Sequence, residues 1–317
     1  MIQGSDGNVY GTTDYGGTND EGVIYRMTLK GKYKVIYSFC SQDNCTDGAI
    51  GEWLTQAADG SFFGQTLSGG NANQGTIFKI TPSGKFTSLY SCCAQANCTD
   101  GAFPVSPLLQ VSDGSFWGTT GEGGANNSGT IFRFVPGNVP QIIYSFCSQA
   151  ECGDGAFPFS GLVLASDGNF YGVTSEGGNS RTTCPLHDYG CGTVFRITPS
   201  GSFTTMYTFC TQSGCPDGQF PQGQIIQAKD GDLYDTTDNG GSENSGTVFK
   251  ISLKGKFTTL YDLCYTGECS DGDIPYAGRV ATPGAAPRRP WDNAIIPFDT
   301  NVLGNSRETA MNRARFI

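Results

Sequence analysis

The chain has 317 residues, enough for one large all-β domain or two ordinary domains. Only 15% of the residues are charged and 46 are glycine, a composition typical of a β protein rich in turns rather than of a helical one. The net charge of −10 argues against the basic face that a nucleic-acid-binding protein needs. No run of about 20 apolar residues is present, so we expect no membrane-spanning helix.

An Asp-Gly pair recurs in each of five repeat units and starts at Asp6, Asp59, Asp113, Asp167 and Asp230. The intervals are 53, 54, 54 and 63 residues, and the last is longer because residues 179–191 contain an insertion. The units start near residues 1, 54, 108, 161 and 224 and extend to residue 281. Met1 falls inside the first unit, so we expect the natural start, with its signal peptide, to lie upstream.

The fourth unit illustrates the four strands that we expect in each. Two β-type runs, GLVLAS (161–166) and NFYGVT (169–174), are joined by an Asp-Gly turn. After a Gly-Gly loop, GTVFRI (192–197) and SFTTMYTF (202–209) are joined by a Pro-Ser-Gly turn. Such turns favour hairpins, because Gly accepts a positive φ and Pro presets the turn. Four antiparallel strands per repeat predict an all-β propeller with five blades. A β-solenoid is the alternative, but its rungs would be shorter.

The two ends of the repeat array leave alternatives open. Residues 278–281 (GRVA) align with the first strand of a unit, so we expect them to complete the first blade and remove an exposed edge. A piece of a larger propeller is the competing interpretation. Residues 282–317 contain no copy of the unit and form a C-terminal extension. A packing extension, a disordered tail and sequence foreign to the repeats all fit them.

Twelve of the thirteen cysteines occur as close pairs: Cys40/Cys45, Cys93/Cys98, Cys147/Cys152, Cys184/Cys191, Cys210/Cys215 and Cys264/Cys269. Zinc sites use tighter Cys-x-x-Cys pairs or more histidines than the single His187. We therefore predict six local disulfides and an oxidising location, extracellular or periplasmic. Cys92 is left over and aligns with Phe39 and Phe146, which predicts a small buried hydrophobic residue.

Three segments carry a resemblance to a known family: YGTTDYGG…GVIYRM, WGTTGEGGANNSGTIFRF and YGVTSEGG…GTVFRITPSG. They resemble the Gloeobacter–Verrucomicrobia tandem-repeat ("GloVer") proteins of bacteria. The resemblance covers about residues 1–281. It implies a propeller-like fold and an extracellular or surface-anchored location, and it implies no known activity. No anchor segment is recognisable in this sequence.

Blade topology predicts that the long loops gather at one end of the propeller. The Gly-Gly loops and the cysteine loops emerge there, and the tight turns emerge at the other end, so we expect function at the loop end. Each cysteine loop contains an aspartate followed by glycine: Asp47, Asp100, Asp154, Asp217 and Asp271. Each aspartate either caps its own turn or joins others in binding Ca²⁺ at the mouth of the channel. The third strands carry one cation each, for which a structural ion pair is the simpler interpretation: Arg26, Lys79, Arg133, Arg196 and Lys250.

The residues that differ between copies are the candidates for a single site. His187 and Asp188 lie in the insertion under the Cys184/Cys191 pair. Glu122 and Glu176 lie in adjacent Gly-Gly loops, where two carboxylates could act as acid and base. An idle loop histidine and solvated glutamates are the plainer alternatives.

Two tryptophans and one glutamate are the candidate ligand-binding residues. Glu52 and Trp53 replace a Pro-containing segment, and Trp117 replaces the usual Tyr. An exposed indole could stack on a sugar, whereas a buried one belongs to the blade core. Asp235 is a further departure, because it replaces the Gly of the Gly-Thr-Thr motif.

Two functions from different classes follow. The first is a secreted, Ca²⁺-assisted hydrolase with its site at the channel mouth, acting on lactones or esters rather than glycosides, by analogy with other small propellers. The second is a non-catalytic carbohydrate-binding or adhesion module with several equivalent sites. For either we expect a monomer and a small-molecule or glycan ligand. The sequence contains no nucleophile elbow, HExxH motif, phosphate loop or DxDxDG loop.

Overall fold

The computed structural model describes residues 1–178, 184, 190–264, 269, 272 and 275. Within these residues the chain forms five four-stranded antiparallel sheets, here called blades 1 to 5, and three short 3₁₀ helices. The predicted all-β fold of five four-stranded repeats is therefore confirmed. Residues 278–281, expected to complete blade 1, lie outside the described residues. In the described part of the chain, Ile2–Gln3 is the first strand of blade 1.

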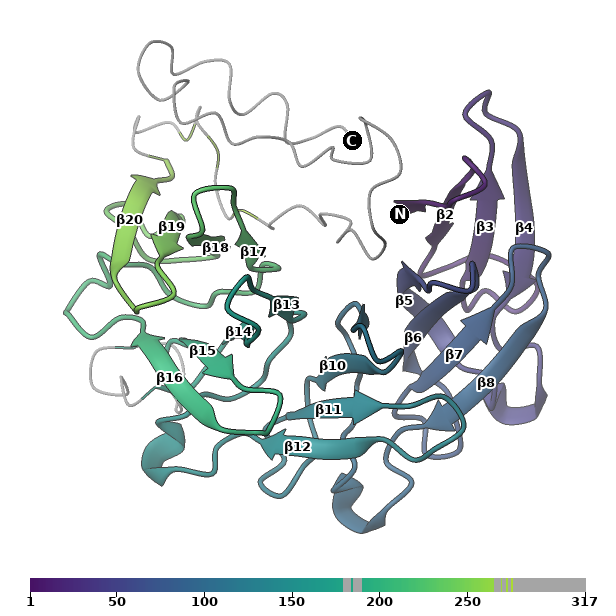
Figure 1. Ribbon diagram of the computed structural model, residues 1–317, viewed down its shortest axis with the longest axis horizontal. Coiled ribbons are helices and arrows are strands. Elements are labelled where there is room, and N and C mark those ends of the chain that lie inside the picture. The colour runs from purple at the N-terminus through teal and green to yellow at the C-terminus, as the bar shows by residue number, and fades with distance from the viewer. Residues whose placement is uncertain (179–183, 185–189, 265–268, 270–271, 273–274, 276–317) are drawn as a thin grey trace. The chain divides into compact units, whose positions relative to one another are not determined.

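Blades 1 to 3 belong to one compact unit of the chain. Blade 1 consists of β1 (Ile2–Gln3), β2 (Val9–Thr12), β3 (Val23–Met27) and β4 (Tyr33–Ser38). Blade 2 consists of β5 (Ala49–Gln56), β6 (Phe62–Ser68), β7 (Thr76–Ile80) and β8 (Phe86–Ser91). Blade 3 consists of β9 (Leu109–Gln110), β10 (Phe116–Thr120), β11 (Thr130–Phe134) and β12 (Gln141–Ser145). In each blade the strands pair in chain order (Figure 1).

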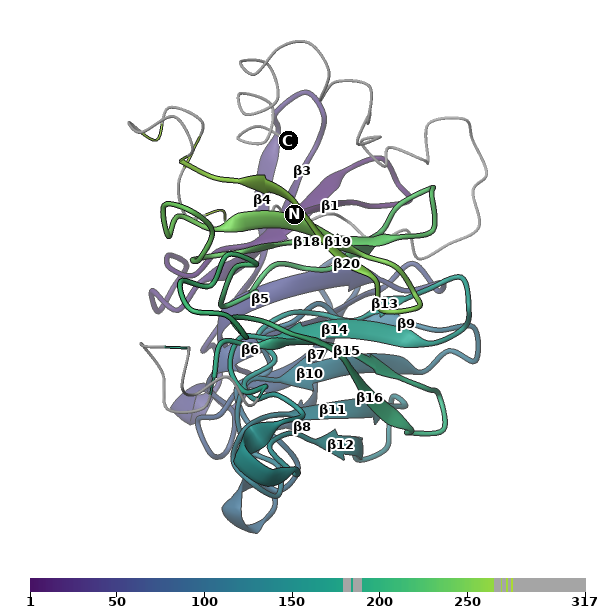
Figure 2. The same ribbon diagram turned by 90° about the vertical axis from the view of Figure 1, so that its left-hand side faces the viewer.

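Blades 4 and 5 belong to a second compact unit. Blade 4 consists of β13 (Val163–Leu164), β14 (Phe170–Thr174), β15 (Thr193–Ile197) and β16 (Phe203–Thr208). Blade 5 consists of β17 (Ile226–Gln227), β18 (Leu233–Thr237), β19 (Thr247–Ile251) and β20 (Phe257–Asp262). The three 3₁₀ helices lie in cysteine loops and are η1 (Asp43–Cys45), η2 (Ala96–Cys98) and η3 (Ala150–Cys152). Figure 2 shows the same strands in a perpendicular view.

The same turn and the same β-bulge occur in every blade. The Asp-Gly turn between the first two strands is fixed by the aspartate itself; in blade 1, Asp6 Oδ1 accepts a hydrogen bond from the Asn8 N–H at 3.0 Å. Gly7 in that turn has φ +80°, which L side chains rarely adopt. The fourth strand carries a bulge at the same position in all five blades; in the first, Ile36 is the extra residue opposite Ile24 and Tyr25. A bulge increases the local twist that propeller blades need.

Lys79, Arg133 and Lys250 of the third strands form ion pairs at the turns between the first two strands of their blades. Lys79 Nζ lies 2.8 Å from Asp59 Oδ2, and Arg133 Nη2 lies 2.8 Å from Asp113 Oδ2. Lys250 Nζ lies 2.8 Å from Asp232 Oδ2 in blade 5. These pairs are part-exposed, so each is expected to contribute little to stability.

The core lies between consecutive blades within each unit, and both faces of the blade 2 sheet are buried. Alternate residues of a strand point to opposite faces, so Phe62 packs towards blade 1 and Phe63 towards blade 3. The ring centroids of Tyr10 and Phe62 are 4.1 Å apart, and those of Phe63 and Phe116 are 4.3 Å apart. Strands buried on both faces explain why the sequence shows continuous apolar runs rather than a simple alternation.

Candidate functional site

The cysteine loops are closed by disulfides, as predicted. The bonds Cys40–Cys45, Cys93–Cys98, Cys184–Cys191, Cys210–Cys215 and Cys264–Cys269 are formed. Cys147 and Cys152 are also disulfide-bonded. Cys92 is free and buried, which confirms its prediction as a small core residue.

The loop aspartates are occupied with their own loops wherever they are described. Asp47 is buried, and its carboxylate accepts hydrogen bonds from the Ser41 N–H at 2.9 Å, the Gln42 N–H at 3.2 Å and the Tyr37 hydroxyl at 2.5 Å. Burial, and then the hydrogen bond to Asp47, raises the pKa of Tyr37. This is the capping role that the sequence offered as the plainer alternative.

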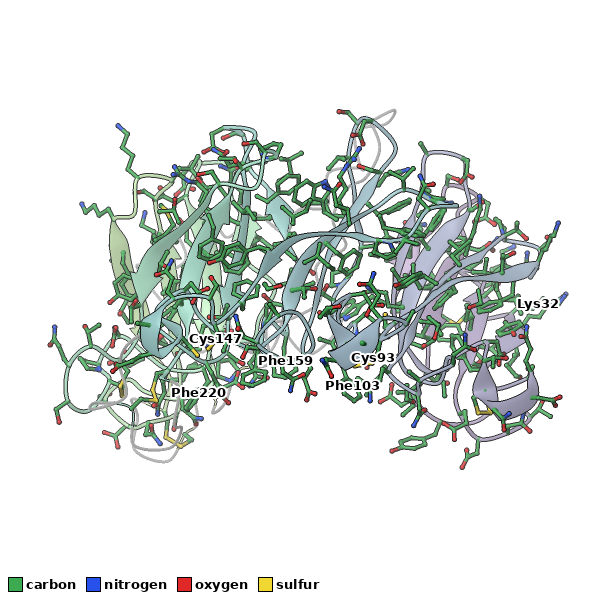
Figure 3. All side chains as sticks on the ribbon, turned by 90° about the horizontal axis from the view of Figure 1, so that it is seen from below. Lys32, Cys93, Phe103, Cys147, Phe159 and Phe220 are labelled. Carbon is green, nitrogen blue, oxygen red and sulfur yellow. A yellow bond between two sulfur atoms is a disulfide. The ribbon has the colours of Figure 1, made fainter. Side chains whose placement is uncertain are left out.

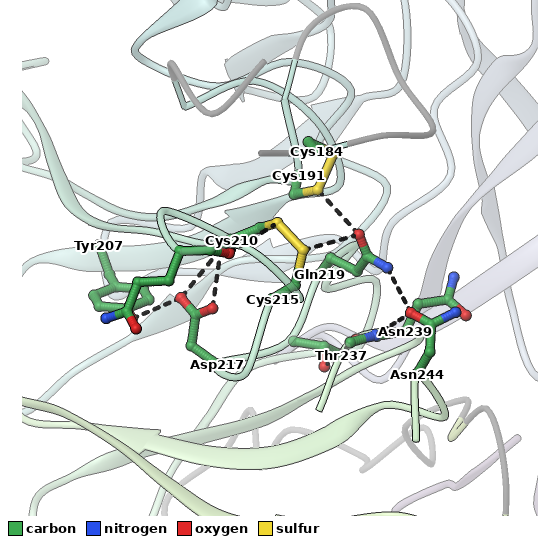
Figure 4. The surroundings of a disulfide bond; sticks show 12 residues. Cys184, Cys191, Tyr207, Cys210, Cys215, Asp217, Gln219, Thr237, Asn239 and Asn244 are labelled. Carbon is green, nitrogen blue, oxygen red and sulfur yellow. Dashed lines mark hydrogen bonds between the residues drawn. A yellow bond between two sulfur atoms is a disulfide. The ribbon is translucent and has the colours of Figure 1, made fainter. Parts of the chain in front are cut away.

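The other loops repeat this arrangement. Asp100 accepts from the Tyr90 hydroxyl at 2.6 Å and from the Ala94 N–H at 2.8 Å. Asp154 is buried and accepts from the Gln149 N–H at 3.1 Å. Figure 4 shows the fourth loop, where Asp217 accepts from the Tyr207 hydroxyl at 2.8 Å. The fifth, Asp271, lies outside the described residues.

The first, second and fourth cysteine loops also join two consecutive blades through backbone hydrogen bonds. In the first loop the Cys45 carbonyl accepts from Gly48 N at 2.8 Å and from Gly70 N, in the Gly-Gly loop of blade 2, at 2.9 Å. The Ile50 N–H donates back to Glu21 O of blade 1 at 3.0 Å. The second loop is built the same way, because the Phe103 N–H donates to Gln74 O at 3.0 Å. Figure 3 labels Phe103 and Cys93 of this loop. The loop is therefore a latch between blades.

Several residues of the first cysteine loop have strained backbone conformations. Cys40, Cys45 and Ile50 have φ values of 56°, 53° and 57°, in the left-handed region that is costly for residues with a Cβ and most of all for a β-branched one. Such conformations cost on the order of 1–3 kcal/mol each and persist only where the surroundings fix them. The disulfide and the buried carboxylate supply that restraint.

Two sulfur atoms of the fourth cysteine loop and one of the preceding Gly-Gly loop lie close together without forming a metal site. The Sγ atoms of Cys191, Cys210 and Cys215 lie within 4.8 Å of one another, but all three cysteines are disulfide-bonded and offer no thiolate. Gln219 Oε1 lies 3.1 Å from Cys191 Sγ (Figure 4). Because a disulfide sulfur has no proton to donate, this is a packing contact.

The predicted acid pair is placed in two different units. Glu122 lies in unit 1 and pairs through its backbone with Ala102, and Glu176 lies in unit 2 and pairs with Ala156. Both side chains are partly exposed at Gly-Gly loops. His187 and Asp188, the other candidates for catalysis, lie outside the described residues.

Blade 2 departs from the repeat where Glu52 and Trp53 occur. Its first strand, β5, has eight residues, whereas the first strands of the other blades have two. A bulge between Gly51 and Leu54 sets Glu52 and Trp53 opposite Gln65 of β6. Trp53 is half-exposed, and its indole Nε1–H donates to Val105 O at 2.9 Å. Trp117, by contrast, is buried in blade 3.

Gln65 is a residue that sequence reasoning missed. Its side chain is 0% exposed, and neither Oε1 nor Nε2 has a hydrogen-bond partner among the described residues. Aligned residues are satisfied: Thr119 donates to Ser160 O at 2.8 Å and Thr236 to Pro275 O at 3.4 Å. A buried amide without partners costs about 1–3 kcal/mol per group, so it calls for an explanation. The sequence does mark this residue, because residues 64–66 read Gly-Gln-Thr where the repeat has Gly-Thr-Thr.

Blade 5 buries two carboxyl groups. Asp235 occupies the place of Gly64, where a Cβ would meet Phe78 Cζ at 2.4 Å, and it pairs across the sheet with Phe249. Its Oδ1 accepts from the Thr236 N–H at 2.8 Å, and its Oδ2 has no partner among the described residues. Burial raises the pKa of Asp235 to about 8, helped by the negative charge of Asp238, and burial raises the pKa of Asp238 to about 6.

Within the described part of the chain, no helix is long and apolar enough to cross a membrane. No curated protein matches the sequence. A family model described as the Gloeobacter/Verrucomicrobia repeat matches residues 1–185.

Three solved structures illustrate the fold. Virginiamycin B lyase from Staphylococcus aureus is 19% identical with a TM-score of 0.50, over 86% of this chain and 74% of that one. The extracellular domain assigned to a hybrid two-component system of B. thetaiotaomicron is 16% identical with a TM-score of 0.54, over 89% of this chain but only 31% of that one. The periplasmic gluconolactonase of Pseudomonas aeruginosa is 17% identical with a TM-score of 0.47, over 82% and 69%. The first two similarities support the propeller class and carry no activity across.

Proposed function

This chain belongs to the Gloeobacter/Verrucomicrobia repeat family, and from that premise we propose that it is a non-catalytic carbohydrate-binding module of the cell exterior, with its ligand site at the bulge of blade 2. The disulfide in every described cysteine loop supports a location outside the cytosol.

The observation that carries the proposal is the pairing of Trp53 with Gln65. A half-exposed indole offers a flat apolar face on which a pyranose can stack. The amide of Gln65 has a donor and an acceptor that no described residue uses, but it is fully buried, so a ligand reaches it only where the bulge opens. Glu52 lies in the same bulge. Apolar stacking combined with a few fixed polar groups is the chemistry of sugar recognition.

The repeated loops contribute rigidity rather than ligand contacts in this proposal. Their aspartates and carbonyls are used in latching blade to blade. A site must therefore draw on residues that differ between copies, and blade 2 supplies three of them together.

The test is a glycan array followed by calorimetry on the best ligand. Trp53→Ala and Gln65→Thr should each weaken binding by at least about tenfold. Gln65→Thr should leave the melting temperature unchanged or raised, because Thr12, Thr119 and Thr236 occupy this position in other blades. Trp117→Tyr, which restores the residue of blades 1 and 4, is the matched control and should bind normally. Equal binding by all variants would refute the site.

A hydrolase of lactones or esters is the second candidate, and the acids of blade 5 favour it. Asp235 and Asp238 are neighbouring buried carboxyl groups whose pKa values are raised by different amounts, a pattern that suits an acid and a base. Calcium at the loop aspartates belongs to this candidate, and it would require Asp47 or Asp100 to exchange backbone hydrogen bonds for the ion.

A panel of lactones, esters and aryl glycosides, assayed with Ca²⁺ and with EDTA, tests the hydrolase. Turnover of one class that Asp235→Gly abolishes would support the blade 5 acids, and turnover that EDTA abolishes would support the metal. Absence of turnover by the folded protein, together with glycan binding, would leave the binding module alone.

A further inference from the structure

Two departures from the repeat meet at the fourth cysteine loop. Cys191 ends the insertion of blade 4 and takes the place of Gln74 in blade 2. Its carbonyl accepts a hydrogen bond from the Phe220 N–H at 2.9 Å, which is the equivalent of the bond that Gln74 accepts from Phe103. Cys191 is 0% and Gln219 2% exposed, so both unusual side chains are buried within this latch. The residues aligned with Gln219 in the three preceding loops are all alanine: Ala49, Ala102 and Ala156.

The fourth loop brings two disulfides into contact, as Figure 4 shows. Cys191 is bonded to Cys184, and Cys210 is bonded to Cys215. The Sγ atoms of Cys191, Cys210 and Cys215 all lie within 4.8 Å of one another, and in the described part of the chain no other three cysteine sulfurs lie so close together. All four cysteines belong to the second unit. We call these three cysteines, together with Gln219, the sulfur cluster.

The amide of Gln219 is oriented by its neighbours. Asn244 Oδ1 accepts a hydrogen bond from the Gly240 N–H at 3.1 Å, which identifies this atom as the oxygen of its amide. Gln219 Nε2 donates to the same oxygen at 2.9 Å. The other atom of the Gln219 amide, Oε1, therefore points to the sulfurs, at 3.1 Å from Cys191 Sγ and 3.5 Å from Cys215 Sγ.

This amide oxygen has no donor while both bridges are closed. Among the described residues its partners are the two sulfurs, and a disulfide sulfur carries no proton. A buried acceptor without a donor destabilises the fold. A thiol does carry a proton, so a thiol at Cys191 or Cys215 would donate to Oε1. The amide is therefore better satisfied when one sulfur of the cluster is a thiol than when all are oxidised.

We infer that the sulfur cluster is a thiol–disulfide exchange centre, which acts when a dithiol opens the Cys184–Cys191 bond. The dithiol is oxidised to its own disulfide, and its two electrons and two protons leave thiols at Cys184 and Cys191. Cys191 then loses its proton, its thiolate attacks Cys210 Sγ, and a Cys191–Cys210 bond forms as the Cys210–Cys215 bond breaks. Cys215 leaves as a thiolate, takes up the proton and donates it in a hydrogen bond to Gln219 Oε1.

The position of Gln219 selects the sulfur that is attacked. Attack on Cys210 releases Cys215, whose Sγ lies 3.5 Å from Oε1 and satisfies this acceptor as a thiol. Attack on Cys215 would release Cys210 and leave both sulfurs beside Oε1 in a new disulfide, so the acceptor would stay without a donor. The exchange therefore ends with thiols at Cys184 and Cys215.

Exchange passes reduction of the insertion on to the latch between blades 4 and 5. In the oxidised chain the Cys210–Cys215 bond closes the loop, and the Cys215 carbonyl accepts from the Gly241 N–H of blade 5 at 2.9 Å. Cys215 has a φ of 47°, a conformation that persists only while its surroundings fix it. Once the bond has moved to Cys191–Cys210, this restraint is gone and the latch loosens.

Replacing Cys184 tests the exchange without any reductant. Cys184→Ser leaves Cys191 as a thiol beside the Cys210–Cys215 bond. After incubation at pH 8, acid quenching, alkylation and peptic mapping of the unreduced chain should find a Cys191–Cys210 bond and an alkylated Cys215. Incubation at pH 5 should give less of this product, because the thiolate is the attacking species.

Cys40→Ser is the matched control, since the structure brings no third sulfur of a described cysteine against the Cys40–Cys45 pair. Cys45 should be alkylated, and the other bonds should stay native at both pH values. An alkylated Cys191 with Cys210–Cys215 intact at pH 8 would overturn the proposal. Bonds from Cys191 to cysteines of other loops would overturn it as well, because the exchange would then reflect unfolding rather than the cluster.

Redox titration of the unsubstituted chain does not depend on the folding of Cys184→Ser. In buffers of a dithiol and its disulfide, the parent should take up two electrons at the sulfur cluster and yield thiols at Cys184 and Cys215. Gln219→Ala, which restores the alanine of the other loops, should need a roughly threefold to tenfold higher ratio of dithiol to disulfide, because the Cys215 thiol loses its acceptor. The bond of the second cysteine loop is the internal control and should be reduced at the same ratio in both proteins. An equal ratio for the cluster, or thiols at Cys184 and Cys191, would contradict the exchange.

Discussion

At the scale of single residues, the informative positions are those where a side chain replaces the repeat residue. Asp235 puts a carboxyl group where four blades have glycine, and it lies in the sheet beside Phe249 rather than at a solvated turn. A charged carboxylate there would lose its hydration without gaining a cation, so the proton stays on to a higher pH. Asp113, at an exposed turn, behaves oppositely: hydrogen bonds from Ser115, and then Arg133, lower the pKa of its carboxyl to about 2.

The buried acids of blade 5 predict stability that falls as pH rises. The pKa of Asp235 is raised from 3.8 to about 8 and that of Asp238 to about 6, so the folded chain holds protons that the unfolded chain releases. Their contribution to the free energy of unfolding is complete below about pH 4 and is lost towards pH 8. The loss is about 1.4 kcal/mol per pH unit for each proton that the folded chain holds and the unfolded chain releases. Asp235→Gly should raise the melting temperature at pH 8 and flatten its decline between pH 5 and 8. The exposed Asp43→Asn is the control, and an unchanged slope in Asp235→Gly would contradict the assignment.

At the scale of elements, the cysteine loop explains why the chain repeats one motif so faithfully. The loop crosses from the outer strand of one blade to the next blade, and it must turn sharply with several residues at positive φ. The disulfide, the buried aspartate and the two hydrogen bonds to the second cysteine carbonyl act together on that one crossing. The loop is therefore a structural joint between blades 1 and 2, between blades 2 and 3, and between blades 4 and 5.

Removing one aspartate from a joint should destabilise the fold. In Asp100→Asn the side chain loses its charge and places an amide against the Ala94 and Gln95 N–H groups, which both donate to the carboxylate in the parent. We expect a loss of about 1–3 kcal/mol in the free energy of unfolding, measured by denaturant titration. Added Ca²⁺ should not restore it, because the role is that of an acceptor for N–H groups. Full recovery with Ca²⁺ would instead indicate a metal ligand.

The sequence predicted the elements better than it predicted the sites. Turn residues, repeat spacing and cysteine pairing are local signals, so the five blades, the disulfides and the buried Cys92 could all be predicted. The bulge in β5 could not, because it depends on which residues pair across the sheet, and with it the pairing of Trp53 with Gln65 stayed hidden. Asp235 was visible as an oddity, but its burial depends on the packing of Phe249 and the neighbouring blade.

At the scale of the whole molecule, the cysteines indicate the compartment in which the protein works. Thirteen cysteines, of which twelve are disulfide-bonded, leave Cys92 as the single thiol. That thiol is 3% exposed and burial raises its pKa, so it should not react in the native protein. Each bridge closes a loop of a few residues and contributes about 2 kcal/mol in the chain-entropy model, so the set matters far more than any one bond.

Thiol titration of unreduced protein tests whether Cys92 is the single thiol. We expect no reactive thiol in native buffer and one in denaturant. Reduction with a phosphine before heating should lower the melting temperature strongly, because every joint between blades is released at once while its strained backbone remains. Cys92→Ser should abolish the single thiol detected in denaturant. Cys92→Phe, which restores the residue found at Phe39 and Phe146, should abolish it as well, and its melting temperature tests whether the fold is kept. Ten or more thiols in denatured, unreduced protein would contradict the bridges, and with them the argument that this chain works outside the cytosol.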